Sequence, residues 1–297
     1  MARHTHVLAM IVGAFLMTLS IVLAMNLQMT VFLMLPPLYA CFLAFSFPRR
    51  VTIASTLLSG AALVLLLDPL HAALYTLSGG IFGLVVYVLS YKAKRIEVVV
   101  VAMGTYMSAL YTAYMMIARD LLGLDVYAAI KINLIQSFGA ELSSMGINVS
   151  DLFEQMSALS LSGMFFVGGL MALWALYFGA RLAASRGIPV LVPSFLNYRL
   201  TELTMIPVAT LFLLLYLLTN LMGGNFGQMA VVLIFILLFL FFLQGISFLA
   251  WWRAKRGKSN RIFYALAPLL FLIPMGQLSL GFLGFIENMT HMRRIGG

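Results

Sequence analysis

The sequence predicts an all-α fold: a polytopic bundle of about nine transmembrane helices that forms one integral membrane domain over residues 1–297. Hydrophobic residues make up 63% of the chain and charged residues only 9%, whereas soluble domains carry roughly a quarter charged residues. Apolar stretches of about 18 residues or more recur along the chain, and each can cross the hydrocarbon core as a helix. The few charges lie between these stretches, as expected for loops outside the bilayer.

Nine apolar stretches account for the predicted helices. Residues 1–25 resemble a signal peptide, but no small-residue cleavage site follows their long apolar core, so we expect a retained first span. Pro36 and Pro37 lie in the middle of the second stretch, where they interrupt backbone hydrogen bonds and form either a packed kink or a broken helix of the kind that frames transporter sites. The predicted spans are 7–25, 29–47, 51–67, 71–90, 96–118, 159–180, 204–221, 227–250 and 262–286.

The distribution of basic residues predicts the orientation of the bundle. All but four of the 18 Lys and Arg residues fall on the side that carries the amino terminus, so the positive-inside rule places that terminus in the cytoplasm. The four exceptions are Arg119, Lys131, Arg293 and Arg294. Nine spans would leave the Arg293–Arg294 pair outside, a conflict that eight full crossings or a re-entrant last segment would remove.

Residues 119–158 form the largest segment that we expect outside the bilayer, on the extracytoplasmic side. A second short helix is expected to begin there at Ser150, a good N-cap residue. The segment is either a surface brace or a lid over an external opening. Before this second helix, apolar residues that recur every four positions predict an amphipathic helix. They are Val126, Ile130, Leu134, Phe138 and Leu142.

Residues 181–203 are too polar to span the bilayer, and Pro189 and Pro193 prevent one continuous helix. We therefore expect this segment at the cytoplasmic interface. Arg199 and Glu202 either contact a partner there or pair with each other, and such an exposed pair contributes only about 0–1 kcal/mol.

Signatures of soluble enzymes do not occur in the sequence, which contains no phosphate-binding loop, no zinc-type Cys/His cluster, no nucleophile elbow and no HExxH. We therefore expect neither an enzyme nor a bound cofactor or metal. The net charge of +9 is assigned to contacts with anionic lipid rather than with nucleic acid. Within the fourth span, Gly79 and Gly83 form a GxxxG pair, which allows a close approach of helices and does not bind phosphate.

Polar side chains at membrane depth are the candidate functional residues, because burying them without partners costs several kcal/mol. Asn225 and Gln228 lie on a glycine-rich turn and are candidate ligands. Gln244 and Gln277 lie deeper in the last two spans. They bond to each other or to backbone groups, or they contact a polar solute.

The closing stretch brings Glu287, His291, Arg293 and Arg294 together after a long apolar sequence. One interpretation is a solvated tail. The other, which we predict, is that Glu287 pairs with Arg293 or Arg294, or with a polar group of another span, and so fixes the last helix.

The last third of the chain also carries a recognisable pattern. A turn, GGNFG, is followed by a span ending in LQGISFLAWW, a basic loop, a final span and the closing GFLGFIENMTHMRR. This pattern resembles the YybS-like family of bacterial predicted membrane proteins, whose members end in a glycine, an acidic residue and an arginine. Gly284, Glu287 and Arg293 or Arg294 occupy those positions, with Glu where the family more often has Asp.

That family is similar in layout to the substrate-binding components of vitamin transporters and to the rod-shape protein MreD. The resemblance implies a multi-pass protein of the bacterial inner membrane with a transporter-like role. Such a protein would bind a small polar or amphipathic solute among its spans and dock a separate energising partner on its basic loops. The alternative is a non-transporting scaffold that recruits cell-envelope or division proteins through 119–158 and 181–203. A wet cavity lined by Gln244, Gln277 and Glu287 would favour transport.

Overall fold

The computed structural model is predominantly helical in its described part, which comprises residues 2–27, 29–93, 95–144, 148–201, 213, 226–260, 273–290 and 292–295. Six helices in this part are long and apolar enough to cross a membrane. The chain is therefore a multi-pass membrane protein. The expected 204–221 span lies outside the described residues, apart from residue 213, and the count of nine spans is not confirmed.

The chain divides into two compact units. Unit 1 consists of Met1–Leu110 and Val167–Asn197. Unit 2 consists of Tyr111–Phe166 and Tyr198–Gly297. Two long helices, α6 (Ile96–Leu122) and α8 (Val149–Ala184), contribute to both units.

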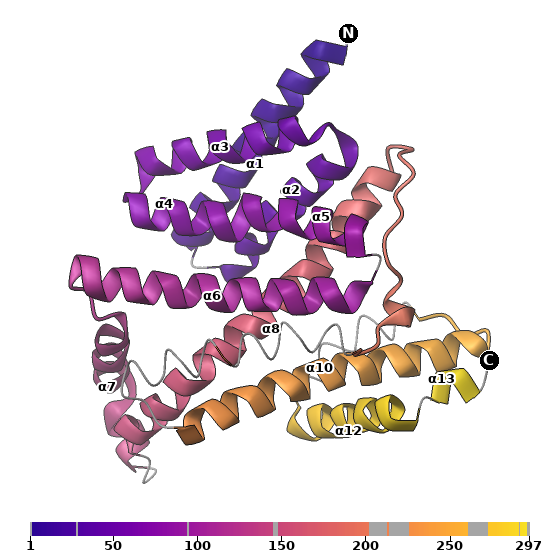
Figure 1. The fold of residues 1–297 in the computed structure, drawn as a ribbon. Helices are drawn as coiled ribbons and strands as arrows, with labels where there is room; N and C mark the ends of the chain where they lie inside the picture. The colour runs from indigo at the N-terminus through magenta and orange to yellow at the C-terminus, as the bar shows by residue number, and fades with distance from the viewer. Residues whose placement is uncertain are drawn as a thin grey trace. The chain divides into compact units, whose positions relative to one another are not determined.

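Unit 1 is built from helices that are joined by short loops and follow one another in the order that the apolar stretches predict (Figure 1). Its other elements are α1 (Ala2–Leu27), η1 (Thr30–Met34), α2 (Leu35–Ser46), α3 (Arg49–Leu66), α4 (Pro69–Thr76), the π-helical segment η2 (Leu77–Ile81), α5 (Phe82–Ala93) and η3 (Phe195–Asn197). α4, η2 and α5 follow one another without a break and together form one candidate span, Pro69–Ala93.

Pro36 and Pro37 differ from the expectation of a mid-span interruption. They lie in the first turn of α2, directly after the 3-10 helix η1. Backbone N–H groups in a first turn have no intrahelical acceptor, so proline is tolerated there. The two prolines therefore begin a helix instead of breaking one, and the apolar helix Val31–Ser46 is shorter than a full span.

Glycines bring α2 against η2 and α5 in unit 1. A Cβ added at Gly79 would lie 2.9 Å from Cβ of Pro36, and one at Gly83 would lie 2.2 Å from the carbonyl oxygen of Pro37. Both distances are shorter than real Cβ contacts, so these positions accept no larger residue without movement. The GxxxG spacing thus corresponds to close helix packing, as predicted.

Hydroxyl groups link α1 to α3 in the same unit. The Ser55 hydroxyl donates to the carbonyl oxygen of Met10 at 3.0 Å, and the hydroxyls of Thr18 and Ser59 lie 3.0 Å apart. Small residues allow the two backbones to approach, and their hydroxyls satisfy one another inside an apolar surrounding. The contact between these helices is therefore uncharged.

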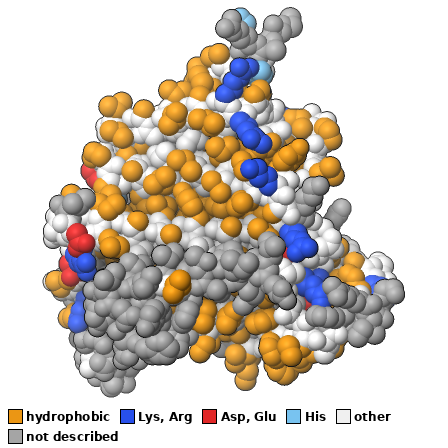
Figure 2. Space-filling view, viewed as in Figure 1, with side chains coloured by type: hydrophobic (Ala, Val, Ile, Leu, Met, Phe, Trp, Pro, Cys, Tyr) orange, Lys and Arg blue, Asp and Glu red, His pale blue; other side chains and the backbone are white. Residues whose placement is uncertain are grey.

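The basic residues of unit 1 gather at one end of its helices. The Arg49 guanidinium at the start of α3 lies 5.9 Å from the ring of Tyr87 in α5, and that of Arg186, just beyond α8, lies 5.0 Å from the ring of Phe42 in α2. In Figure 2, Lys and Arg side chains line one end of α3–α5, while hydrophobic side chains cover much of the remaining face. At the opposite end of α3, Asp68 caps α4.

Unit 2 contains α7 (Val126–Ser144), α10 (Phe226–Lys255), α12 (Pro274–Thr290) and α13 (Met292–Ile295), with parts of α6 and α8. The expected helix over 126–142 is present. However, Ile130, Ile132 and Ile135 are all exposed, so the apolar residues of α7 are not all buried against neighbouring elements on one face of the helix. A helix begins at Val149, next to the predicted N-cap Ser150, but it is not short: the sequence from there to the next span contains no proline, and the helix continues to Ala184 as α8.

Candidate functional site

Two glycines bring α10 and α12 into backbone contact in unit 2. A Cβ added at Gly245 would lie 2.1 Å from the carbonyl oxygen of Leu280, and one at Gly284 would lie 2.0 Å from that of Phe241. A side chain larger than hydrogen would therefore separate the helices. Next to this crossing lie the polar residues Gln244 and Glu287.

Gln244 is fully buried and both ends of its amide are hydrogen-bonded. Its Nε2 donates to Oε2 of Glu287 at 2.5 Å and to Oδ1 of Asn288 at 3.3 Å. Its Oε1 accepts from the backbone N–H of Leu200 at 3.2 Å. The amide thus links α10 to α12 and to the extended segment that follows η3.

Glu287 and Arg293 form an ion pair at the end of α12. The carboxylate is 0% exposed and the guanidinium side chain 11%, with Nε of Arg293 3.3 Å from Oε1 of Glu287. Neither Nε of Arg293 nor Oε1 of Glu287 forms a hydrogen bond here, so the attraction between the two groups is coulombic. Arg293 also donates to the Ser247 hydroxyl at 3.2 Å and to the carbonyl oxygen of Gln244 at 3.5 Å. We call Gln244, Ser247, Glu287 and Arg293 the Gln244 network.

The backbone around Tyr198 covers this network. The Ser247 hydroxyl donates to the carbonyl oxygen of Tyr198 at 3.3 Å, and the Tyr198 hydroxyl donates to that of Leu240 at 3.5 Å. Tyr198 itself is completely buried. Sequence reasoning missed Ser247 and Tyr198. Ser247 lies three residues after Gln244 and so shares its helix face, a signal that was present in the sequence.

The direction of α12 corrects the expected last span. Gly281 lies against Leu238 and Glu287 against Gln244, so both helices advance toward the same end, as Figure 1 shows. Two consecutive spans joined by one short loop would be antiparallel. Instead, α12 begins at Pro274 and runs in the same direction as α10, so the described part of the expected 262–286 span is not antiparallel to α10; residues 262–272 lie outside the described residues.

The carboxyl-terminal tail consequently lies at the basic end of α10. Met292 lines the same hollow as Trp251, Trp252 and Lys255. Arg293 therefore shares its end of unit 2 with the basic residues that close α10, and the conflict with the charge pattern disappears for Arg293.

Among the candidate residues whose side chains are described, Gln277 does not join the Gln244 network. Gln277 is half-buried in the first turns of α12, far along the helix from Glu287, and Gln244 does not bond to it. Gln228 lies at the start of α10, and Arg294 lies in α13, but their side chains are outside the described part of the structure. Asn225 and Glu202 lie outside the described residues altogether.

The site offers hydrogen-bonding groups and one buried pair of opposite charges. No group of three or more His, Cys, Asp or Glu residues that could hold a metal ion occurs among the residues described. The network can therefore hold or exchange a polar or charged group, but it presents no metal-binding geometry. In comparisons with known proteins, no family model, no curated protein and no solved structure matches the chain.

Proposed function

We propose that this protein binds a small solute in a transporter-like manner at the Gln244 network, in the cytoplasmic membrane of a bacterium. The observation that carries this proposal is the fully buried carboxylate of Glu287 between the Gln244 amide and Arg293. Ionisable groups inside membrane proteins commonly mark the path or site of a polar substrate.

Packing alone does not require this pair. The crossing at Gly245 and Gly284 already brings the helices to backbone contact, and a buried ion pair carries a desolvation cost of several kcal/mol that apolar residues would avoid. The network therefore contributes something other than the association of α10 with α12. A solute with hydrogen-bonding groups could replace the bonds that Gln244 and Glu287 now make with each other.

Arg293 is the group that we expect to move. It follows the end of α12 on the separate short helix α13, and it is the only member of the pair with any exposure, at 11%. An anionic group on a solute would attract the guanidinium away from Glu287. This would open the network from the basic end of unit 2, which we place in the cytoplasm by the positive-inside rule. A separate energising partner would dock at the same basic loops, and the YybS-like resemblance is consistent with such a protein.

The test is equilibrium binding of a panel of vitamins and small metabolites to the purified full-length chain. We expect saturable binding of at least one compound, loss of that binding in Gln244→Leu and Glu287→Gln, and its retention in Gln277→Leu. Gln277 is a matched control because it is a half-buried glutamine on the other end of α12. A folded protein that binds nothing in the panel, or equal effects of Gln244→Leu and Gln277→Leu, would overturn the proposal.

A second candidate function, a scaffold for other proteins, is favoured by one feature of unit 1. The extended segment 188–194 presents Leu191 with 95% of its surface exposed, while the Tyr177 hydroxyl holds the segment through the carbonyl oxygen of Pro193 at 2.7 Å. A photo-crosslinking residue at position 191 in intact cells should capture one identified protein that a crosslinker at Leu65, exposed on α3, does not capture. Capture of lipid alone at both positions would exclude this function.

A further inference from the structure

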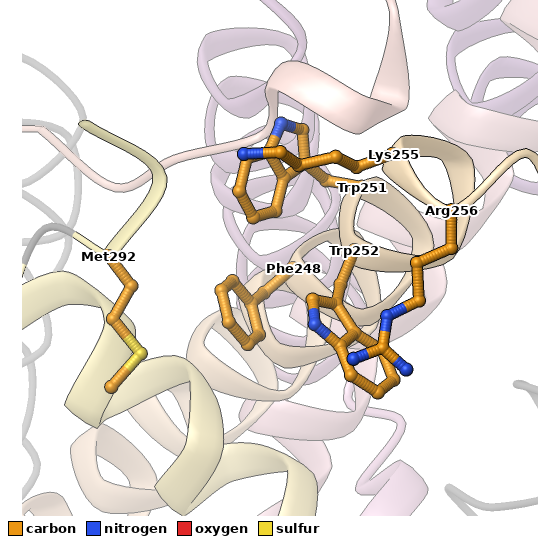
Figure 3. A pocket seen from close by; sticks show the side chains of 6 residues that line it. All are labelled: Phe248, Trp251, Trp252, Lys255, Arg256 and Met292. Carbon is orange, nitrogen blue, oxygen red and sulfur yellow. The ribbon is translucent and has the colours of Figure 1, made fainter. Parts of the chain in front are cut away.

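A hollow of about 460 Å³ opens at the end of α10 in unit 2. Aromatic rings, a methionine and two cations surround it (Figure 3). Its lining residues are Phe248, Trp251, Trp252, Lys255, Arg256 and Met292. None of these residues belongs to the Gln244 network.

The two cations at the hollow are held by the indole rings. The Arg256 guanidinium carbon lies 3.6 Å from the centre of the Trp252 ring, and Nζ of Lys255 lies 5.5 Å from that of Trp251. Figure 3 shows the Arg256 side chain lying over Trp252. A cation stacked on a ring keeps N–H groups free to donate to an anion. Among the described residues, neither Lys255 nor Arg256 forms an ion pair with a carboxylate.

The hollow lies where the apolar part of α10 ends. The candidate span Val231–Lys255 terminates at these cations, and the chain continues through further basic residues. Tryptophan is enriched at this level, because its ring is apolar and its N–H is polar. Phe248, only 9% exposed, and Met292 on α13 add apolar surface on the membrane side of the cations.

We propose that this hollow binds one anionic phospholipid, with Lys255 and Arg256 contacting its phosphate and an acyl chain lying over Phe248 and Met292. Any phosphate monoanion could satisfy the two cations. An acyl chain is needed to cover the apolar side, which favours a lipid over free phosphate. Because Phe248 belongs to α10 and Met292 to α13, the lipid would hold α13 against α10.

Tryptophan fluorescence provides a direct test. The chain has three tryptophans, so a Trp174→Phe background leaves Trp251 and Trp252 as the reporters. The full-length protein is reconstituted in phosphatidylcholine vesicles that contain a small fraction of dibrominated phosphatidylglycerol or, in a parallel sample, dibrominated phosphatidylcholine. We expect the brominated anionic lipid to quench well beyond its share of the bilayer and the zwitterionic lipid to quench only in proportion to its share.

Two pairs of substitutions locate the effect. Lys255→Gln with Arg256→Gln should weaken binding of the anionic lipid about 30-fold, since each cation near the surface contributes roughly five- to sixfold. Lys92→Gln with Arg95→Gln removes the same charge from exposed positions of unit 1 and should leave the quenching unchanged. All variants are compared by thermal unfolding to verify the fold.

Three results would overturn the proposal. Equal quenching by the two brominated lipids would show that the hollow does not select anionic lipid. Persistent selectivity in the Lys255→Gln/Arg256→Gln protein would show that other residues bind it. Loss of selectivity on addition of excess inorganic phosphate would identify the occupant as free phosphate.

Discussion

Unit 1 and unit 2 hold their helices together by different means. In unit 1, α5 approaches α2 through Gly83, and α3 joins α1 through the hydroxyl of Ser55, so the contacts are close and uncharged. In unit 2, α10 and α12 cross at Gly284 and are joined in addition by the buried charges of Glu287 and Arg293.

This difference shows which part of the chain carries more than structure. Lipid tails are as apolar as the side chains, so helices in a membrane associate through close packing and interhelical hydrogen bonds. In unit 1, the contacts of α2 with α5 and of α1 with α3 rely on glycine and serine, although Glu97 of α6 is also buried in this unit. The buried pair of Glu287 and Arg293 in unit 2 is a feature that close packing does not require, and substitutions can separate its role from that of the glycines.

The largest effect is expected at the glycine crossing of unit 2. In Gly284→Leu, the new Cβ would meet the carbonyl oxygen of Phe241 at 2.0 Å, where neither backbone can yield without separating the helices. This overlap exceeds ordinary overpacking of 1–3 kcal/mol, and we expect a loss of about 5 kcal/mol or complete failure to fold.

Denaturant unfolding in detergent measures this effect. Gly163→Leu is the matched control on α8, because a Cβ at Gly163 meets nothing within 4 Å. Similar stability of the two variants would contradict the close approach of α10 and α12.

The next largest effect concerns the charge pair. Glu287→Leu leaves the Arg293 guanidinium in a buried site without its counter-charge, which is expected to destabilise the protein by about 3–5 kcal/mol. Removing both charges, in Glu287→Leu with Arg293→Leu, should recover much of this loss. The same unfolding measurement applies, and a double variant as unstable as the sum of the single variants would contradict the pairing.

A smaller effect is expected in unit 1. A Cβ at Gly80 would lie 2.5 Å from Cγ2 and 2.6 Å from Oγ1 of Thr56, so Gly80→Ala should cost about 1–3 kcal/mol. The obstructing atoms belong to one side chain, and the Thr56 hydroxyl is buried without a hydrogen-bond partner. Adding Thr56→Ala should therefore restore stability. If the second substitution brings no recovery in thermal unfolding, α3 does not limit the packing at Gly80.

Local features of this structure could be predicted from the sequence. Apolar length identifies the helices, the spacing of Gly79 and Gly83 indicates close packing, and the isolation of Glu287 and Arg293 in an apolar chain suggests that the two charges meet. Each of these signals comes either from the spacing of neighbouring residues or from the cost of burying a charge. Residue type and spacing in the sequence indicate both of these properties.

The direction of helices could not be predicted in the same way. Hydropathy marks an apolar stretch at 262–286 but does not tell that α12, which begins at Pro274, runs alongside α10 in the same direction. Nor does it reveal that Leu200 supplies a backbone N–H to Gln244, since that bond joins segments distant in the sequence. Such contacts depend on tertiary packing, for which a single sequence carries only indirect signals, such as the conflict of Arg293 with the charge pattern.

The smallest effect is expected at the end of unit 1 opposite its basic residues. Asp68 caps α4 by accepting from the backbone N–H groups of Leu70 and His71, each at 3.1 Å, and its Oδ2 lies 2.5 Å from Nδ1 of His71. The backbone N–H of His71, and then its side chain, lower the pKa of the Asp68 carboxyl below its ordinary value. A carboxyl with a lowered pKa in the folded state stabilises that state above its unfolded pKa, and the stabilisation is lost as the pH falls through the folded pKa.

Asp68→Asn retains an acceptor for the cap but cannot titrate, so the difference in melting temperature between wild type and variant should shrink on acidification below about pH 4. Titration of groups that do not contact Asp68 cancels in that difference, so a gap independent of pH would show that the charge of Asp68 does not stabilise the turn.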